Sequence, residues 1–301
     1  MTGLARVTVL TNPTSGHGNA PHAAERAVTQ LHKRGVDVVA IAGTDAEHAR
    51  RLTEGALERG MDALVVVGGD GIISLALQVL AKTDIPLGII PAGTGNDHAR
   101  EFRIPTKDPE AAADVVVDGI IDSVDLGRIV GADGTDKWFG TVMAAGFDSL
   151  VTDRTNRMKW PHGRMRYNVA MVAELSKLRL LPFRLSFDGE ELVTELTLAA
   201  FGNTRSYGGG MLICPDADPT DGQLDATMVQ SASRSKLIRL FPTVFKGTHV
   251  DLDQVRTARA RVITVDSPGI NAYADGEYVC PLPVEVSAVP AALKILRPAF
   301  Q

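Results

Sequence analysis

Residues 63–71 read Ala-Leu-Val-Val-Val-Gly-Gly-Asp-Gly, and this stretch decides how the first part of the chain is expected to fold. Five apolar residues followed by glycines are typical of a buried β-strand that ends in a tight turn. Apolar residues at helical spacing between Ile72 and Leu80 predict a helix directly after the turn. Glycines let the backbone approach a ligand closely, and the N–H groups at a helix start attract anions. The stretch therefore predicts a loop that binds an anionic, phosphorylated ligand.

Three similar strand–helix units are expected elsewhere in the first hundred residues. The strand predicted at residues 86–90 is followed by Pro91-Ala92-Gly93-Thr94-Gly95-Asn96-Asp97. Strands are also predicted at residues 6–11 and 36–41, each before a helical pattern. The second of these helices opens with Thr44 and, three residues on, Glu47, which is the spacing of a capping box with Thr44 as N-cap. Four such units in succession predict a parallel sheet with helices on both faces.

Beyond residue 122 the pattern changes to short strand-like runs separated by Gly, Asp and Pro turns. Strands are expected at residues 138–143, 183–187, 195–201, 224–229, 260–265 and 284–289. Phe187-Asp188-Gly189-Glu190 has the composition of a hairpin turn, and helices are expected at residues 165–181 and 234–245. We therefore expect residues 1–127 to form an α/β domain and residues 128–283 a β-rich antiparallel sandwich. Residues 284–301 are expected to return to the first domain.

The composition is that of an ordinary folded globular protein, with 45% hydrophobic and 22% charged residues. A net charge of −5 gives no bulk attraction to nucleic acid. Cys214 and Cys280 lie far apart and show no metal-binding spacing, which suggests a reducing cytosol. No apolar run approaches the roughly 20 residues of a membrane span, and no secretory signal is visible at the start. We expect a cytoplasmic protein and leave open peripheral membrane contact and the oligomeric state, a homodimer included.

The loops after the four predicted strands carry the candidate binding residues. In a parallel α/β sheet, ligands bind outside the carboxyl ends of the strands. The four loops contain Asn12-Pro13-Thr14-Ser15-Gly16, Thr44, Gly68-Gly69-Asp70-Gly71 and Gly93-Thr94-Gly95-Asn96-Asp97. Hydroxyls and backbone N–H groups suit phosphate oxygens, and the carboxylates of Asp70 and Asp97 suit Mg²⁺. Each loop alone also fits a plain turn or a helix cap, so the prediction depends on all four meeting at one edge of the sheet.

Together with a late Asp275-Gly276-Glu277, three of these motifs resemble, in their order, the signature of the diacylglycerol kinase catalytic fold. They are the loops that begin at Asn12, Gly68 and Pro91. The chain is most similar to the soluble bacterial diacylglycerol kinase group, over nearly its whole length. The resemblance implies an ATP-binding α/β domain of the NAD-kinase and diacylglycerol-kinase type and a β-rich lipid domain. It also implies Mg²⁺-dependent transfer of the γ-phosphoryl group of ATP to the hydroxyl of diacylglycerol, which gives phosphatidic acid.

The same resemblance assigns a role to each matching position. Glu277 corresponds to the proposed general base, and Asp70 and Asp97 are expected to act with it in catalysis. The nucleotide is expected to contact Asn12, Pro13, Thr14, Ser15, Gly16, Thr44, Gly68, Gly69, Asp70, Gly71, Ser74, Gly93, Thr94 and Asn96. Two positions depart from the family pattern, which usually has Thr or Ser where Ile72 stands and Asn where Ser74 stands. The loss of one hydroxyl leaves the backbone cradle in place.

Metal ligands are also implied by the resemblance. Asp97 and Asp125 are expected to belong to the Mg²⁺ network at the nucleotide. Asp218, Asp221 and the carbonyl of Gln223 resemble a second, structural Mg²⁺ site, for which a plain Asp-Gly turn is the alternative interpretation.

One locally basic stretch could bring the protein to its lipid. It contains Arg154, Arg157, Lys159, Arg164 and Arg166, interleaved with Met158, Trp160 and Met165. Cations beside apolar anchors suit an anionic membrane surface, although a solvated loop and helix face explains the same residues. The predicted helix at residues 234–245 is the next candidate for a docking face.

Three other functions remain compatible with the sequence. A kinase of NAD shares the Gly-Gly-Asp-Gly motif and a similar two-domain plan. A kinase of another lipid alcohol, such as a sphingoid base or monoacylglycerol, would need the same residues. Because Ile72 and Ser74 depart from the family pattern, a nucleotide-binding regulator without catalysis is the third alternative. The chain has neither a P-loop sequence nor G-x-G-x-x-G after its first strand. The Gly93-Thr94-Gly95-Asn96-Asp97 run and the late Asp275-Gly276-Glu277 favour the lipid kinase over the kinase of NAD.

Overall fold

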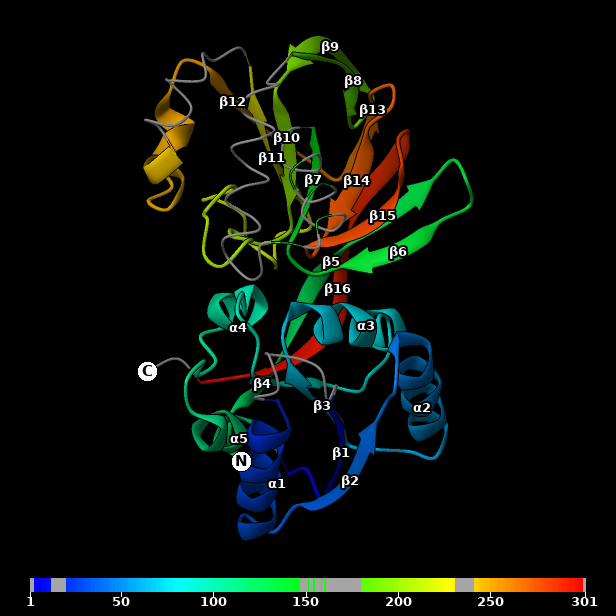
Figure 1. The fold of residues 1–301 in the computed structure, drawn as a ribbon, viewed down its shortest axis with the longest axis vertical. Helices are drawn as coiled ribbons and strands as arrows, with labels where there is room; N and C mark the ends of the chain where they lie inside the picture. The colour runs from blue at the N-terminus through cyan, green and yellow to red at the C-terminus, as the bar shows by residue number, and fades with distance from the viewer. Residues whose placement is uncertain are drawn as a thin grey trace. The chain divides into compact units, whose positions relative to one another are not determined.

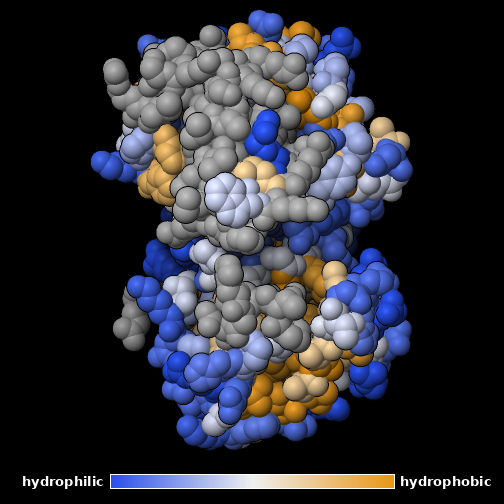
Figure 2. All heavy atoms as spheres, viewed as in Figure 1, coloured by the Kyte–Doolittle hydropathy of each residue, from blue (hydrophilic) through white to orange (hydrophobic). Residues whose placement is uncertain are grey.

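The computed structural model describes residues 3–11, 20–146, 180–230 and 241–299, together with Val151, Arg154, Met158 and Trp160. The chain divides into two compact units. The first contains Met1–Leu126 and Pro290–Gln301, and the second contains Gly127–Val289. In the described part of the chain no helix is long and apolar enough to cross a membrane. Hydrophilic residues cover most of the visible described surface of each unit, with smaller apolar areas between them (Figure 2).

The first unit is a parallel α/β sheet, as the sequence predicts. Its elements in chain order are β1 (Arg6–Thr11), α1 (Ala20–Lys33), β2 (Asp37–Ala42), α2 (Ala46–Glu58), β3 (Ala63–Gly68), α3 (Asp70–Leu80), β4 (Leu87–Pro91), α4 (Asp97–Glu101) and α5 (Pro109–Asp118). The strand order is β2-β1-β3-β4, and all neighbours run parallel. Helix α1 packs against α5, and α2 packs against α3 (Figure 1). Every residue of β3 and β4 is buried, which explains why these two strands read as continuous apolar runs.

The second unit is an antiparallel β-sandwich, again as predicted (Figure 1). Its strands are β5 (Ile120–Gly131, which begins in the first unit), β6 (Asp136–Phe139), β7 (Val142–Gly146), β8 (Leu181–Phe187), β9 (Glu190–Leu196), β10 (Leu198–Gly202), β11 (Leu224–Val229), β12 (Val255–Ala260), β13 (Val262–Asp266), β14 (Asn271–Ala274), β15 (Glu277–Pro281) and β16 (Val284–Arg297), with a 3₁₀ turn at Thr248–Asp251. One sheet has the order β12-β11-β10-β7-β14-β15, and the other contains β16-β13-β8-β9. A core that includes the buried rings of Phe139, Phe183 and Phe201 holds the unit together.

Two hairpins of the second unit have the same turn chemistry. The predicted turn at Asp188 and Gly189 is confirmed, because Phe187 pairs with Glu190 across it. Both central residues have positive φ, 48° and 95°, as a type I′ turn requires. Asp275 and Gly276, with φ of 51° and 79°, make the same turn between β14 and β15.

Three predicted strands were wrong in extent because each is interrupted. The run at 138–143 breaks at Gly140 and Thr141, whose N–H groups donate to the Asp275 carboxylate at 3.0 and 2.8 Å. The run at 260–265 breaks at Arg261, whose N–H donates to Asp188 Oδ1 at 3.1 Å. The run at 195–201 breaks at Thr197, which lies between β9 and β10. At two of the three breaks, a distant carboxylate replaces the strand ladder as the partner of the backbone.

The two helices predicted in the second unit can be compared with the structure only in part. Most of the helix expected at residues 165–181 lies outside the described residues, and its last residue, Leu181, begins β8 instead. In the helix expected at residues 234–245, residues up to 240 lie outside the described part and residues 241–244 are helical.

The start of α2 corrects a predicted cap. Asp45, and not Thr44, is the N-cap, and its carboxylate accepts a hydrogen bond from the His48 N–H at 2.8 Å. That hydrogen bond and the Thr44 hydroxyl hold the pKa of the Asp45 carboxyl below its usual range. A carboxylate beside the helix start attracts its N–H groups more strongly than a hydroxyl does, so the cap lies one residue later.

The C-terminal strand β16 runs from the second unit into the first. Residues 284–287 pair with β13, and Ile295 pairs in parallel with Leu87 of β4. The return to the first unit therefore begins at Pro290 and not at residue 284, because the first part of the strand is held by β13.

Two glycines should respond oppositely to alanine. Gly127 pairs with Phe139 in the β5–β6 ladder, and a Cβ on Gly127 would collide with the buried Phe139 ring. We expect Gly127→Ala to lower the free energy of unfolding by about 2 kcal/mol through overpacking. Gly55→Ala, in the middle of α2, meets only the flexible end of Arg59 and should raise it by about 0.5 kcal/mol. Urea denaturation of both variants checks this, and equal effects would contradict the packing described for Phe139.

Candidate functional site

Two glycine loops touch at the carboxyl edge of the parallel sheet. The loop after β3 contains Gly69, and the loop after β4 contains Gly93. A Cβ on Gly69 would come within 3.1 Å of the Gly93 Cα, and a Cβ on Gly93 would lie even closer to the Gly69 backbone. The Ala92 N–H also donates to the Gly68 carbonyl at 2.8 Å. The two loops can lie this close only because both contact positions are glycine.

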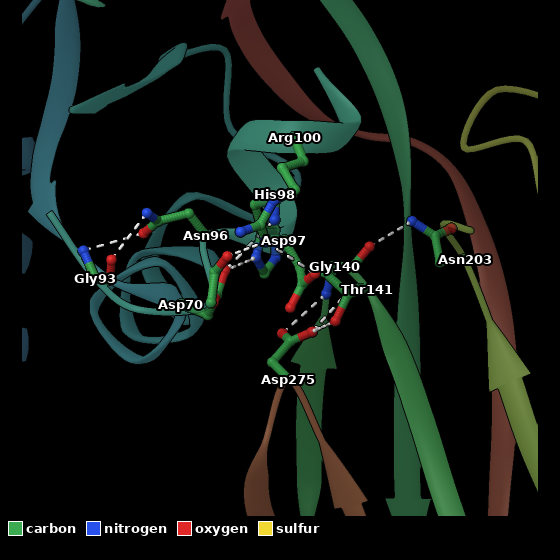
Figure 3. A network of polar contacts seen from close by, with 11 residues as sticks. Asp70, Gly93, Asn96, Asp97, His98, Arg100, Gly140, Thr141, Asn203 and Asp275 are labelled. Atoms are coloured by element: carbon green, nitrogen blue, oxygen red, sulfur yellow. Dashed lines mark hydrogen bonds and ion pairs between the residues drawn. The ribbon is translucent and has the colours of Figure 1, made fainter. Parts of the chain in front are cut away.

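Asn96 fixes the shape of the second loop. It has a left-handed backbone, with φ of 54°, just before α4. Its side chain does not cap the helix; its Oδ1 accepts from the Gly93 N–H at 3.0 Å, and its Nδ2 donates to the Gly93 carbonyl at 2.9 Å (Figure 3). This pair of hydrogen bonds closes residues 93–96 into a rigid turn.

The carboxylates of Asp70 and Asp97 converge beside Gly95, at the position that a Cβ on this residue would take. Each aspartate is the first residue of a helix, α3 and α4 respectively. A Cβ on Gly95 would lie 2.6 Å from Asp70 Oδ2 and 3.5 Å from Asp97 Oδ2. The structure thus brings the two predicted acidic residues together on one side of the touching loops. Helix N-termini favour such negative charge.

Two residues on α4 that the sequence analysis did not single out hold these carboxylates. His98 Nδ1 lies 3.2 Å from Asp70 Oδ1 (Figure 3). Arg100 donates to the Gly95 carbonyl and lies 3.4 Å from Asp97 Oδ1. The signal in the sequence was a histidine and an arginine within three residues of Asp97, but nothing in the local pattern indicated which carboxylates they would meet.

The electrostatic environment keeps Asp70 ionised at neutral pH. Burial by itself raises the pKa of its carboxyl, but the hydrogen bond and charge of His98 and the backbone N–H groups of His98 and Asn96 outweigh it. The net result is a pKa below the usual value. Asp70 therefore presents a carboxylate, the form that ligates cations.

The paired carboxylates fit a divalent cation that is shared with a phosphate ligand. Across the described residues, no group of three or more His, Cys, Asp or Glu side chains is arranged to hold a metal ion alone. Mg²⁺ commonly takes only one or two protein carboxylates and completes its shell with water and substrate phosphates. Asp70 and Asp97 supply two such carboxylates beside the two glycine loops.

The other predicted nucleotide contacts are placed differently. Thr44, Gly71 and Thr94 are exposed at the same edge of the sheet. Gly68 is buried at the end of β3. Ser74, in α3, is also buried, with 1% of its surface exposed. Such burial does not support Ser74 as a phosphate contact. Asn12, Pro13, Thr14, Ser15 and Gly16 lie outside the described residues.

Asp125 is a buried residue of β5 that holds the C-terminal strand. Its Oδ1 accepts a hydrogen bond from the Ala291 N–H at 2.8 Å, at a residue with a left-handed backbone. The structure gives Asp125 this structural partner in the first unit.

In the second unit, Asp275 and Glu277 differ in environment. Asp275 is buried, and its carboxylate accepts hydrogen bonds from the Gly140 and Thr141 N–H groups and from the Thr141 hydroxyl at 2.6 Å (Figure 3). Glu277 begins β15 with a side chain that is 48% exposed, and its Oε2 lies 3.3 Å from Lys137 Nζ. Asp275 thus anchors the turn, and Glu277 projects from it toward solvent.

The residues expected to form a structural Mg²⁺ site are largely occupied by their own turn. Asp218 Oδ1 accepts from the Thr220 N–H and hydroxyl, at 3.0 and 2.6 Å. Asp221 accepts from the Gln223 N–H at 2.9 Å and is ion-paired with Arg259. Because a guanidinium already neutralises Asp221, the geometry favours the plain turn over a cation site.

Other predicted functional features can be compared only in part. Trp160 is 76% exposed, whereas Arg157, Lys159, Arg164, Met165 and Arg166 lie outside the described residues.

Cys214 and Cys280 are buried free thiols. Burial raises the pKa of the Cys214 thiol to about 12, so it is not a nucleophile at neutral pH.

Two family models match the chain. Residues 6–129 match the diacylglycerol kinase catalytic domain, and residues 141–297 match the YegS C-terminal NAD kinase beta sandwich-like domain. A protein named "Diacylglycerol kinase" from Mycobacterium tuberculosis (strain ATCC 25618 / H37Rv) is 67% identical over 296 residues, which cover 98% of this chain and 96% of the relative. Another of that name, from Bacillus subtilis (strain 168), is 28% identical and covers 94% and 93% of the two chains.

A third relative has a broader name. The protein named "Probable lipid kinase YegS-like" from Stenotrophomonas maltophilia (strain K279a) is 32% identical and covers 89% of this chain and 90% of the relative. Among solved structures, that of a diacylglycerol kinase from Bacillus anthracis str. Sterne matches with a TM-score of 0.74. Its sequence identity is 20% over 99% of this chain and 98% of that chain, so it supports the fold alone.

Removal of the Asp275 carboxylate should destabilise the second unit. Asp275→Ala leaves three buried donors on Gly140 and Thr141 without their acceptor. We expect a loss on the order of 3 kcal/mol in the free energy of unfolding, measured by urea denaturation. Asp253→Ala, an exposed aspartate of the same unit, should change it by less than about 0.5 kcal/mol. A parental stability for Asp275→Ala would show that these hydrogen bonds contribute nothing to the turn.

Proposed function

The chain belongs to the diacylglycerol kinase family, and from this premise we propose that it transfers the γ-phosphoryl group of ATP to the hydroxyl of diacylglycerol, giving phosphatidic acid. The observation that carries the proposal is the convergence of Asp70 and Asp97 at Gly95, between two touching glycine loops. This arrangement offers backbone N–H groups for phosphates and two carboxylates for a cation at one edge of one sheet.

Each part of the site has a physical task in phosphoryl transfer, which needs positioning and charge neutralisation more than covalent chemistry. The backbone of residues 69–71, 94 and 95 would orient the phosphate oxygens, and Thr44 and Thr94 offer exposed hydroxyls at the same edge of the sheet. Asp70 and Asp97 would hold Mg²⁺ through their carboxylates. Bound Mg²⁺ supplies charge neutralisation at the transferring phosphoryl group.

Glu277 is the proposed general base for the acceptor hydroxyl. Its carboxylate is exposed at the start of β15 and close to Lys137, and the buried anchor at Asp275 keeps the turn in place. An alcohol loses its proton late in phosphoryl transfer, so a carboxylate within hydrogen-bond reach of the hydroxyl is sufficient.

Diacylglycerol is proposed as the acceptor because the 67% identical relative bears that enzyme's name. The YegS-like relative makes another lipid alcohol the competing outcome. At the membrane surface, the exposed Trp160 is a suitable apolar anchor for an enzyme that meets its lipid from the cytoplasm.

Purified protein with ATP and Mg²⁺ should phosphorylate diacylglycerol, with the product identified by mass spectrometry of the lipids. Monoacylglycerol, a sphingoid base and NAD serve as competing acceptors in the same assay. Phosphorylation of NAD alone, or of no acceptor at all, would refute the proposal, and preference for another lipid would change the substrate.

Asp70→Asn and Asp97→Asn should each lower kcat by at least about 100-fold while the protein stays folded, because both lose a charge that holds the cation. Asp37→Asn, an exposed aspartate at the start of β2, should keep the parental rate. Near-parental turnover in either site variant would remove that residue from the proposed mechanism.

A further inference from the structure

The two converging carboxylates are each held through one oxygen by a side chain of α4. His98 Nδ1 lies 3.2 Å from Asp70 Oδ1, and the His98 backbone N–H is directed at the same oxygen at 3.4 Å. Arg100 lies 3.4 Å from Asp97 Oδ1. In both aspartates it is the other oxygen, Oδ2, that lies beside Gly95. In each carboxylate, Oδ1 is therefore held by a side chain of α4, and Oδ2 is directed toward Gly95.

Because the His98 ring is buried, it has little freedom to move away from Asp70. Only 3% of its side-chain surface is exposed, whereas the Asp70 side chain is 20% exposed. The backbone of Asp70 is already fixed as the first residue of α3, so the carboxylate can change its orientation only by rotating about its side-chain bonds. Two contacts from His98 to a single oxygen oppose that rotation.

Such a grip matters because the two carboxylates repel each other before a cation arrives. Two like charges in a partly buried site lower their repulsion energy by turning apart, and this repulsion is larger than in water because the local dielectric constant is lower. Without a fixed donor, Asp70 would turn its Oδ2 away from Asp97 and would have to be reoriented each time a cation binds.

We propose that His98 is a positioning residue that fixes the plane of the Asp70 carboxylate, so that Oδ2 is presented to a divalent cation beside Asp97. The proposal rests on the function proposed above for Asp70. In metal sites, loss of an outer-shell group that hydrogen-bonds a metal ligand typically lowers metal affinity or activity by about 10- to 100-fold.

Two substitutions separate the hydrogen bond from the space that the ring fills. His98→Phe fills a similar volume and removes the Nδ1 donor. His98→Asn keeps a side-chain N–H near the position of Nδ1 and so can still donate to Asp70 Oδ1. Both keep the backbone N–H of residue 98. His32→Asn, an exposed histidine in the last turn of α1, is the matched control for the change of side chain.

The first readout is binding of Mn²⁺ with ADP to each purified protein, followed by electron paramagnetic resonance of the free ion. His98→Phe should weaken this binding by at least about tenfold, and His98→Asn and His32→Asn by less than about threefold. In the kinase assay, His98→Phe should lower kcat and raise the half-saturating Mg²⁺ concentration, with the KM for diacylglycerol unchanged. Parental binding by His98→Phe, or equal losses in His98→Phe and His98→Asn, would overturn the proposal.

A second measurement needs no folded Phe variant. In the parent protein with ¹⁵N-labelled histidine, the His98 resonance, assigned with His98→Asn, should show a protonated Nδ1, because that nitrogen donates to Asp70. An unprotonated Nδ1 would overturn the proposal whatever the variants do. Since Mn²⁺ binding and the ¹⁵N spectrum involve no lipid, the outcome for His98 stays distinct from failure of the lipid assay. Failure of the parent to bind Mn²⁺ with ADP would refute both.

Discussion

The contact between the backbones of Gly69 and Gly93 is the constraint on which the rest of the site depends. Parallel pairing of β3 with β4 places the ends of the two strands side by side, but only the absence of a Cβ at both positions lets the loops meet. Because the loops meet, the helices that follow them start next to each other, and their first residues, Asp70 and Asp97, converge at Gly95. A pair of helix N-termini can tolerate this concentration of negative charge.

The second unit uses carboxylates for a different purpose. Asp188 and Asp275 each sit in a type I′ turn and accept backbone N–H groups at a break between two other strands. Each therefore ties a hairpin to a distant strand end with charge-assisted hydrogen bonds, which are stronger than those they replace. Asp221 and Asp225 instead meet Arg259, where burial raises the pKa of the Asp225 carboxyl in spite of the neighbouring guanidinium. Such anchors explain why a unit composed of short strands keeps its turns fixed.

Local pattern was sufficient to predict the parallel sheet, the antiparallel sandwich and the turn at Asp188, since each follows from the succession of short segments whose periodicity and turn residues are local. It was also sufficient to predict that Asp70 and Asp97 lie at one edge of the sheet, because the loops that follow parallel strands all lie at the carboxyl edge. It failed where a distant side chain decides, because Asp275 divides the predicted strand at Gly140. Local pattern also gave no indication that Arg259 would form an ion pair with Asp221. Ser74 and Ile72 show a further limit, since only the packing of α3 reveals that both face the core. His98 was missed for the same reason, because its partner lies 28 positions away in the sequence.

The central proposal is that a cation and a phosphate meet beside Gly95, at the Oδ2 atoms of Asp70 and Asp97. Isothermal titration of Gly95→Ala with ATP and Mg²⁺ tests this most directly, because an added methyl group would come within 2.6 Å of Asp70 Oδ2 and must therefore displace that carboxylate. We expect the Kd to rise by at least about tenfold in a variant that remains folded, as its thermal unfolding curve shows. Parental affinity in a variant that carries this methyl group would place the nucleotide elsewhere and contradict the account.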